Sequence, residues 1–352
     1  MRRIDTVILG AGGYVGGELL RLLASHPHFH VAAAVSESRV GQPLSALLPP
    51  LQPSYPDAQF VSMEQSLQDI DDGSDVAIFA AAPHGVSASI IAKTLDVARA
   101  RNLNAKIVDL SADFRHRSED VFASIYDTTH AAPELLGDFE CVLPEHAEET
   151  PSGHISHPGC FATAALLATV PLIASDSIEP DVFLSGVTGS TGSGRTASAG
   201  THHPERHANL YAYKPLAHRH APEIASLTAA HTGVTPRVHF VPHSGPFARG
   251  IHITLAARTQ HAQSAEDILE VYRSFYAHSV FVDVVSGTPR LKDVVASNRA
   301  LIGVAVEGGQ LAAFCVIDNL IKGAAGGAVQ WMNRLWGIPQ EAGLTAPGIS
   351  WT

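Results

Sequence analysis

The chain has 352 residues, of which 45% are apolar and 16% charged, so it can bury a sizeable core, and its length favours two domains. Its 34 acidic residues outnumber its 23 Lys and Arg residues, and the resulting charge of −11 argues against nucleic-acid binding, which needs a positive field. We expect a cytoplasmic protein. No uninterrupted apolar run reaches the roughly 18 to 20 residues of a membrane span, no signal-peptide pattern opens the chain, and the three Cys residues form no paired spacing.

The first part of the chain alternates apolar runs with helical patterns. A short apolar run at residues 6–9 stops at a glycine cluster, and a helical pattern follows. Further apolar runs lie at residues 31–35, 76–80 and 105–110. This alternation is typical of βαβ units in a parallel sheet buried on both faces. We therefore predict a doubly wound α/β domain of the Rossmann type over residues 1–155.

The pattern changes after about residue 150, where residues 150–154 have the composition of a linker. A helix is expected at 162–173, and strands at 181–185, 238–241 and 251–255. A second helix is expected at 265–276, and residues 301–306 and 311–316 read as a hairpin. These elements predict an α+β second domain over residues 156–324. We expect the helical segment that follows, within residues 325–352, to return to the first domain.

The glycine cluster has the spacing Gly10-x-Gly12-Gly13-x-x-Gly16 between the expected strand and helix. In that context glycines let the backbone approach a pyrophosphate, and the helix N-terminus offers free N–H groups to it. The end of the second strand selects between the two nicotinamide dinucleotides. There Ser36, Ser38 and Arg39 suit a 2′-phosphate, while Glu37 would suit a free ribose hydroxyl. The sequence thus predicts an NADP site.

Cys160 differs in its surroundings from Cys141 and Cys315. It follows a Pro-Gly break and opens an expected helix. At such a position the helix dipole and the free N–H groups stabilise a thiolate and could hold an oxyanion. The other two cysteines lie inside apolar runs and are interpreted as structural. Cys160 is therefore the candidate nucleophile.

Two histidine groups stand out among the 20 histidines, at residues 201–207 and 218–224. His-rich spacings can bind zinc, so a metal site is one interpretation of them. Neither group has the HExxH or paired-CxxC spacing of a specific zinc motif. A histidine acting as general acid or base beside a thiolate agrees better with the rest of the sequence, and we predict no metal.

Seven stretches in order carry a resemblance to a known family: residues 10–19, 109–115, 158–160, 192–195, 218–224, 241–243 with 247–250, and 318–323. Through them the chain resembles the N-acetyl-γ-glutamyl-phosphate reductases of arginine biosynthesis, which belong with aspartate-semialdehyde dehydrogenases in fold and chemistry. Two stretches depart from that pattern. Residues 161–163 read Phe-Ala-Thr where Tyr-Pro-Thr is usual. Residues 201–206 are more similar to the reductase that acts on carrier-bound aminoadipyl phosphate in lysine biosynthesis.

The resemblance implies roles for the matched residues. It places the nucleophile at Cys160 and the catalytic histidine in the motif 218–220, where we favour His220 and keep His218 as a substrate or phosphate contact. The implied substrate contacts are His218, Arg219, Arg249, Arg115 and Ser193. The implied cofactor contacts are Gly10, Gly12, Gly13, Tyr14, Val15, Gly16, Ser36, Ser38, Arg39, Pro83, Ser190, Gly192 and Asn319.

The chemistry implied is NADPH-dependent reduction of a small acyl phosphate to an aldehyde through a cysteine thioester, in a homo-oligomer (dimer or tetramer). Sister reductases for aminoadipyl or aspartyl phosphate are the alternatives within this class. Two interpretations from other functional classes stay open. One is an NADP-binding sensor without an activated thiol, and the other is a zinc hydrolase built on the histidines.

Overall fold

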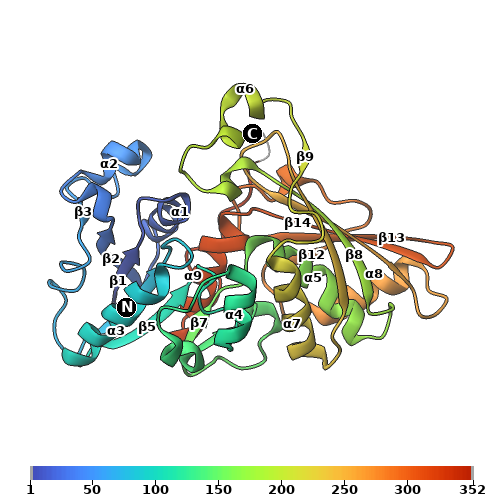
Figure 1. The fold of residues 1–352 in the computed structure, drawn as a ribbon, viewed down its shortest axis with the longest axis horizontal. Coiled ribbons are helices and arrows are strands. Elements are labelled where there is room, and N and C mark those ends of the chain that lie inside the picture. Colours follow the sequence, from blue (N-terminus) through green and yellow to red (C-terminus); the bar gives the residue numbers. More distant parts are fainter. Residues whose placement is uncertain (1–2, 350–352) are drawn as a thin grey trace. The chain divides into compact units, whose positions relative to one another are not determined.

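The computed structural model describes residues 3–349. Their contacts divide the chain into two compact units (Figure 1). Of the described residues, the first unit comprises 3–158 together with Ala324–Thr345, and the second comprises Gly159–Gly323 and 346–349. The end of the chain thus differs from expectation, because residues 346–349 belong to the second unit, where the Ile349 N–H donates to the Val295 carbonyl at 3.1 Å.

The first unit is built on a parallel sheet in the order β3-β2-β1-β4-β5-β7-β6. Its strands are β1 (Ile4–Leu9), β2 (Phe29–Val35), β3 (Phe60–Val61), β4 (Asp75–Ala80), β5 (Asn104–Asp109), β6 (Phe139–Cys141) and β7 (His154–Ser156). Its helices are α1 (Tyr14–Leu23), α2 (Leu44–Leu47), α3 (Ser87–Ala100), α4 (Glu119–Tyr126) and α9 (Gly326–Leu335). The strand order reverses between β1 and β4, and ligands of such sheets bind outside the carboxyl ends of the strands at this point.

Two details of the first unit bear on the sequence predictions. His154 is not part of a linker, because it opens β7, which pairs with β5 and β6. The returning helix α9 packs against β5, and the Trp331 indole N–H donates to the Val142 carbonyl at 2.9 Å. The predicted fold class, a Rossmann-type sheet with a returning C-terminal helix, is confirmed.

The second unit contains a mixed sheet in the order β12-β13-β14-β11-β8-β10-β9. Its strands are β8 (Asp181–Thr188), β9 (Tyr211–Ala212), β10 (Arg237–Ser244), β11 (Ile251–Arg258), β12 (Val282–Val284), β13 (Ala300–Glu307) and β14 (Gln310–Ile317). Its helices are α5 (Cys160–Ala174), α6 (His203–Arg206), α7 (His220–Thr232) and α8 (Ala265–Phe275). The expected hairpin is present as β13 and β14, which pair in antiparallel register.

Helix α5 is the centre of the second unit and contacts α7, α8, β11 and β14. It is apolar around its whole circumference, as a helix packed on all sides must be, and residues 161–173 are all buried. Pro171 lies inside it and has no N–H for the Leu167 carbonyl. The Tyr276 hydroxyl donates to that carbonyl instead, at 2.9 Å. The first residue of α5 is thereby carried on a rigid element.

Candidate active site

The glycine turn in the first unit leaves the N-terminus of α1 open. Gly10 has a φ of +82°, and a Cβ there would lie 2.6 Å from the Ala81 carbonyl oxygen, so the turn requires glycine. Helix α1 then begins at Tyr14 behind Gly13, an extended N-cap without a side-chain hydrogen bond. The N–H groups of the first turn are therefore not capped by a side chain and suit a pyrophosphate.

The residues expected at the 2′-phosphate lie beside this turn. A Cβ on Gly12 would be 2.8 Å from the Ser36 hydroxyl oxygen and 3.7 Å from Cδ of Arg39. Glu37 is engaged elsewhere, because its carboxylate accepts the Met63 N–H at 2.7 Å. One oxygen of the carboxylate that would have suited a ribose hydroxyl is thus held by the backbone, which weakens the one sequence feature against NADP.

The loops after β4 and β5 are fastened to each other. The Asp113 carboxylate accepts the N–H groups of Gly85 and Ala88 at 2.7 and 3.0 Å, which holds the loop containing Pro83. The Asp109 carboxylate is fully buried and accepts the hydroxyls of Ser87 and Ser111 at 2.8 and 2.7 Å. Burial raises the pKa of Asp109 to about 6 despite these hydrogen bonds. These contacts fix the backbone at the carboxyl edge of the sheet.

Arg115 lies in the same region and is buried. Its Nε donates to the His157 carbonyl at 3.1 Å, and its Nη2 donates to the Leu110 carbonyl at 3.3 Å. The guanidinium therefore braces the backbone that leads into Pro158. Its predicted contact with substrate stays a prediction.

Cys160 is the first residue of α5 and is half-buried. Gly159 precedes it as an extended N-cap, and its carbonyl accepts the Thr163 N–H at 2.7 Å, the first hydrogen bond of the helix. Cys315 differs, because it is fully buried and burial raises the pKa of its thiol. A thiol at a half-exposed helix N-terminus is the more reactive kind.

Two residues that the sequence reasoning did not single out border Cys160. The fully buried Glu223 carboxylate, in the first turn of α7, accepts the Gly159 N–H at 2.6 Å. Gly323 packs against the nucleophile, since a Cβ on it would lie 2.8 Å from Cβ of Cys160. Both residues lie within stretches that carried the family resemblance. The contacts themselves join positions far apart in the chain.

The histidines of the 218–220 motif lie in the same neighbourhood. The ring of Phe161, which follows the nucleophile, is 5.9 Å from the His218 ring and 6.2 Å from the His220 ring between centroids. Nδ1 of His218 accepts the His220 N–H at 3.2 Å. Burial, reinforced by the charges of Arg219 and Lys214, lowers the pKa of His218 to about 4. His218 is thus neutral with one ring nitrogen already occupied, which favours His220 as the proton carrier.

Tyr213 completes this cluster. Its ring lies 5.7 Å from that of His218. Burial raises its phenol pKa above the ordinary value, and Cys160 contributes to the same effect, so the phenol lies within electrostatic reach of the thiol. The phenol therefore stays protonated and can act as a hydrogen-bond donor near the nucleophile.

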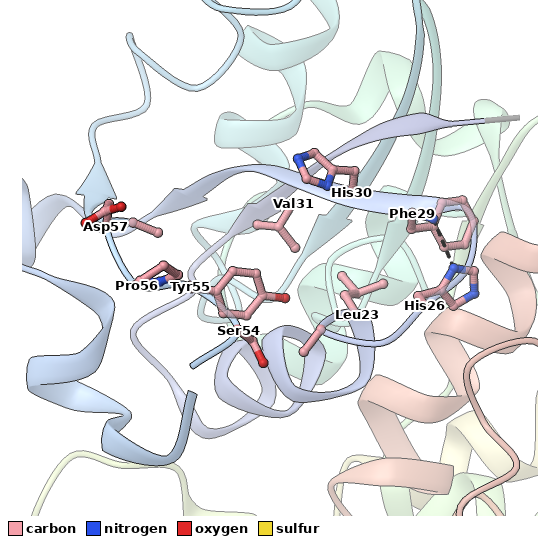
Figure 2. A pocket seen from close by; sticks show the side chains of 11 residues that line it. Leu23, His26, Phe29, His30, Val31, Ser54, Tyr55, Pro56 and Asp57 are labelled. Atoms are coloured by element: carbon pink, nitrogen blue, oxygen red, sulfur yellow. Dashed lines mark hydrogen bonds between the residues drawn. The ribbon is translucent and has the colours of Figure 1, made fainter. Parts of the chain in front are cut away.

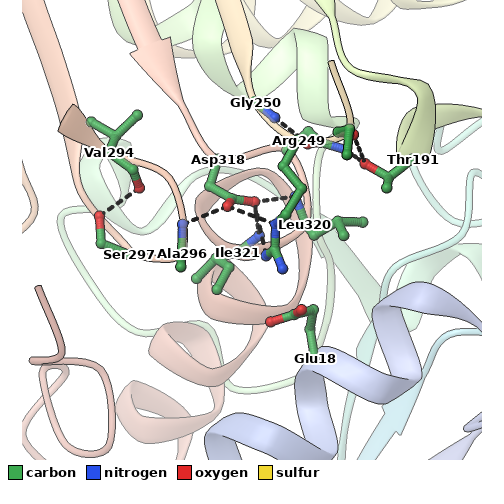
Figure 3. Close-up of polar contacts among 12 residues, drawn as sticks. Glu18, Thr191, Arg249, Gly250, Val294, Ala296, Ser297, Asp318, Leu320 and Ile321 are labelled. Atoms are coloured by element: carbon green, nitrogen blue, oxygen red, sulfur yellow. Dashed lines mark hydrogen bonds and ion pairs between the residues drawn. The ribbon is translucent and has the colours of Figure 1, made fainter. Parts of the chain in front are cut away.

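Asp318 organises a second group of predicted site residues (Figure 3). Its fully buried carboxylate pairs with Arg249, with Nε to Oδ2 at 3.1 Å and Nη2 to Oδ1 at 3.3 Å. It also accepts the Ala296 and Leu320 N–H groups at 2.7 and 2.8 Å. Much of the Arg249 guanidinium therefore holds Asp318. Whether it also contacts substrate stays a prediction.

Asn319 connects two loops beside this pair. Its Oδ1 accepts the Gly250 N–H at 2.7 Å, and its Nδ2 donates to the Thr191 hydroxyl at 3.0 Å. The Ser190 N–H donates to the Phe247 carbonyl at 2.9 Å, and Gly192 and Ser193 are exposed in the same loop. The structure thus gathers Ser190, Gly192, Ser193, Arg249 and Asn319 within the second unit.

A separate cavity of about 400 Å³ lies in the first unit beside α1 and β2 (Figure 2). Its lining includes His26 and Tyr55, whose polar atoms are already used. The Tyr55 hydroxyl donates to the Leu20 carbonyl at 2.9 Å, and the His26 ring bonds to the Phe29 N–H and to Asn333 at 3.0 Å each. The cavity is therefore a weak candidate for a binding site. Among residues 3–349, no group of three or more His, Cys, Asp and Glu residues is arranged to hold a metal, and no helix is long and apolar enough to cross a membrane.

Two family models cover most of the chain. Residues 5–153 match the model described as semialdehyde dehydrogenase, NAD binding domain, and residues 160–319 match semialdehyde dehydrogenase, dimerisation domain. Among solved structures, aspartate semialdehyde dehydrogenase II of Vibrio cholerae, complexed with ASA, aligns with a TM-score of 0.69 at 18% identity, over 96% of this chain and 99% of that one. The NADP complex of the Candida albicans enzyme gives 0.68 at 16%, over 95% and 98%. These likenesses agree with the fold described above.

Curated relatives are more similar. The N-acetyl-gamma-glutamyl-phosphate reductase of Heliobacterium modesticaldum is 36% identical over 360 residues, covering 98% of this chain and 99% of the relative. That of Methanopyrus kandleri is 38% identical over 347 residues, covering 97% and 98%. A protein of Aeropyrum pernix, named as a LysW-aminoadipate/LysW-glutamate phosphate reductase, is 36% identical over 361 residues, covering 99% of each chain. At this identity over nearly the full length the predicted family is confirmed: the chain belongs to the N-acetyl-γ-glutamyl-phosphate reductases, within the semialdehyde dehydrogenases.

Proposed function

We propose that the chain is an NADPH-dependent reductase that converts N-acetyl-γ-glutamyl phosphate to N-acetylglutamate γ-semialdehyde and phosphate. The observation that carries this proposal is the position of Cys160 at the start of α5, next to Phe161, whose ring contacts those of His218 and His220. A half-exposed thiol at a helix N-terminus, with histidines close by, suits acyl transfer to a cysteine.

In this reaction the Cys160 thiolate attacks the acyl carbon, the C–O bond to phosphate breaks, and a thioester forms with release of phosphate. The N–H groups at the start of α5 stabilise the oxyanion of the tetrahedral intermediate. When bound, NADPH supplies the hydride that reduces the thioester. His220 then donates and removes the protons needed as the hemithioacetal collapses to aldehyde and thiol. The thioester keeps the acyl group of the acyl phosphate activated and holds its carbonyl carbon on the protein while hydride is delivered.

The remaining predicted residues receive supporting roles in this proposal. His218, Arg219, Arg249, Arg115 and Ser193 contact the substrate. Gly10, Gly12, Gly13, Tyr14, Val15, Gly16 and Pro83 in the first unit, and Ser190, Gly192 and Asn319 in the second, contact the dinucleotide. Ser36, Ser38 and Arg39 receive the 2′-phosphate, a role supported by the closeness of Ser36 and Arg39 to Gly12 and by the engagement of Glu37 at Met63. We also propose a cytoplasmic homo-oligomer, a dimer or tetramer, since the second family model is described as a dimerisation domain.

A second candidate is reduction of a carrier-bound aminoadipyl phosphate. The name of the Aeropyrum pernix relative and the segment 201–206 favour it. The formal charge of −11 opposes docking of an acidic carrier at long range, which favours the free acyl phosphate.

The test is phosphate-dependent NADP⁺ reduction with free N-acetylglutamate semialdehyde, which runs the reaction backwards. We expect turnover that requires both phosphate and NADP⁺ and needs no carrier protein. Activity only with an acyl group attached to a carrier would reject this substrate in favour of the second candidate.

A further inference from the structure

The His-Pro-Glu-Arg segment ends α6 with a buried arginine that the proposed function has not used. Arg206 is 8% exposed, although a guanidinium is charged at any pH the protein meets. Its Nη1 donates to the carbonyls of Ser244 and Asn209 at 3.3 and 3.4 Å. Its Nε and Nη2 are buried and have no hydrogen-bond partner among residues 3–349. Its described hydrogen-bond partners are both neutral carbonyls rather than carboxylates.

An unpaired buried charge is expensive, because the guanidinium loses its water and gains no counter-charge. Such groups call for an explanation, and a missing ligand is one of the few available. The two unpartnered nitrogens, Nε and Nη2, share one edge of the planar guanidinium. Their N–H bonds run parallel along that edge, which is the fork that binds a carboxylate through both oxygens. The chemistry of the vacant edge therefore points to a carboxylate.

The chain after Arg206 runs along β10 toward the histidines. Tyr211 and Ala212 of β9 pair with Ser244 and His243 of β10. Further along, the Tyr213 N–H donates to the Pro242 carbonyl at 3.0 Å. Arg206 is thus held beside Ser244, the last residue of β10. Tyr213 lies beside Pro242, two residues closer to the middle of that strand.

The nucleophile lies at the same end of the neighbouring strand. In the parallel pair of β8 and β10, Gly186 is opposite Pro242 and Thr188 is opposite Ser244. Gly186 packs on Phe161, since a Cβ there would lie 2.6 Å from Cε1 of that ring. Phe161 therefore lies at the strand position of Pro242 and Arg206 at that of Ser244. These two levels are two residues apart, or about 7 Å along the strand direction. Cys160 precedes Phe161 at the end of α5 that faces the carboxyl end of β8.

We propose that Arg206 binds the α-carboxylate of the acyl substrate while Cys160 attacks its γ-carbonyl carbon. This inference rests on the proposed function. In a γ-glutamyl group these two carbons are separated by four carbon–carbon bonds of about 1.5 Å each, an extended span of about 5 Å. With a hydrogen bond of about 3 Å from the carboxylate to the guanidinium, the group is long enough to bridge the separation of about 7 Å between the two levels. Nε and Nη2 are shielded from solvent, so binding of the carboxylate requires the residues that cover them to move aside.

The test compares two aldehydes that differ only in this group: N-acetylglutamate semialdehyde, and acetamidobutyraldehyde, which lacks the α-carboxylate. Phosphate-dependent NADP⁺ reduction is measured for the wild type, Arg206→Met and Arg206→Lys. The matched control is Arg237→Met, which removes an exposed arginine at the opposite end of β10, where an ion pair with Asp181 at 3.8 Å contributes little.

We expect Arg206→Met to lower kcat/KM for the carboxylate-bearing aldehyde by about 10²-fold, mostly through KM, as loss of a charge-assisted contact should. The rate with acetamidobutyraldehyde and the KM for phosphate should stay within about threefold, Arg206→Lys should be intermediate, and Arg237→Met should match the wild type.

Equal losses with both aldehydes would overturn the inference and make Arg206 a support for the Ser244 and Asn209 carbonyls. A raised KM for phosphate alone would overturn it in favour of a phosphate site. Both outcomes are measured with a wild type that is active. If the proposed function itself were wrong, the wild type would not oxidise N-acetylglutamate semialdehyde at all, so the two results can be told apart.

Discussion

The N-termini of α1 and α5 are built alike and serve different chemistry. Each helix begins behind a glycine N-cap, Gly13 or Gly159, in extended backbone without a side-chain cap. Each therefore presents uncapped N–H groups and the positive end of a helix dipole. The surroundings of the two ends differ.

At α1 the glycine turn packs directly on the first turn of the helix. A Cβ on Gly16 would lie 2.5 Å from Cα of Ala11, so no side chain separates the two backbones there. At α5 the neighbours are side chains, with Glu223 bonded to the N-cap N–H and Phe161 buried behind the nucleophile. A ligand that leaves after each turnover needs an open backbone cradle, whereas a covalent nucleophile needs its own atoms fixed. Changes near α5 should therefore alter turnover, and changes near α1 should alter cofactor affinity.

The largest effect is expected at the nucleophile. Cys160→Ser should lower turnover by at least about 10³-fold while the fold and NADPH binding persist, because a serine hydroxyl is a much weaker nucleophile at neutral pH. Turnover and NADPH titration check the two halves of this expectation. Cys141→Ser, at a half-buried cysteine in β6, is the matched control and should retain activity. A Cys160→Ser variant that kept most of its rate would exclude the thioester route.

His220→Asn should come next, with turnover lowered by roughly 10²- to 10⁴-fold, the usual contribution of one general acid–base group. His218→Asn should act mainly on the apparent KM, because its ring is already neutral and accepts the His220 N–H. Steady-state kinetics of both variants separate these effects. If the two patterns were exchanged, His218 would be the proton carrier.

Gly323→Ala tests whether the nucleophile must be fixed. The added methyl group would lie 2.8 Å from Cβ and 3.2 Å from Cα of Cys160, so the thiol must move. A displacement of about 1 Å at a reacting atom costs about 10²-fold in rate, and NADPH affinity should not change. Gly137→Ala is the control, since a Cβ there meets no atom within 4 Å. Unchanged turnover in Gly323→Ala would mean that the nucleophile tolerates movement.

Local patterns in the sequence were sufficient for the Rossmann domain. A buried parallel strand is apolar throughout, and the glycine turn lies between such a strand and a helix, so both features are legible within a few residues. The position of Cys160 at a helix start was predictable for the same reason, from the Pro-Gly break before it. The predicted linker at 150–154 is wrong at His154, which begins strand β7. The pairing of β7 with β5 is not visible in the local composition of the sequence.

The contacts that complete the site could not be predicted in this way. Glu223 meets Gly159 across 64 positions of chain, and Gly323 meets Cys160 only because the segment after β14 returns to the start of α5. Glu37 shows the same limit. Its position at the end of β2 suggested a ribose contact, yet its carboxylate binds the Met63 backbone 26 positions away. Partners of this kind depend on the folded topology.

Arg39→Ala tests the cofactor side of the comparison. Loss of a charge-assisted phosphate contact costs about 1.5 to 3 kcal/mol, so NADPH binding should weaken by about 10- to 100-fold and NADH binding should barely change. Turnover at saturating NADPH should stay near that of the wild type. Glu37→Gln is the control and should leave the preference for NADPH intact, because that side chain faces Met63. An equal loss of affinity for NADPH and NADH would mean that Arg39 contacts a part of the cofactor that both dinucleotides share.

The smallest effect concerns acid stability, which should be lost mainly in the first unit. Burial lowers the pKa of His26 and of His154 to about 4, and both lie in that unit. Nδ1 of His26 accepts the His28 and Phe29 N–H groups, so a proton there would face two donors. The unfolded chain binds these protons below about pH 6.5 and the folded chain only below about pH 4. The contribution of the two histidines to stability is therefore fully present above pH 6.5 and falls as the pH drops through this window.

Urea unfolding followed by the fluorescence of Trp331 and Trp336, which belong to the first unit, should give a lower midpoint at about pH 5 than at about pH 7. His26→Asn should reduce this difference, and the exposed His30→Asn should not. Equal midpoints at the two pH values would show that the buried histidines are protonated without cost to the fold.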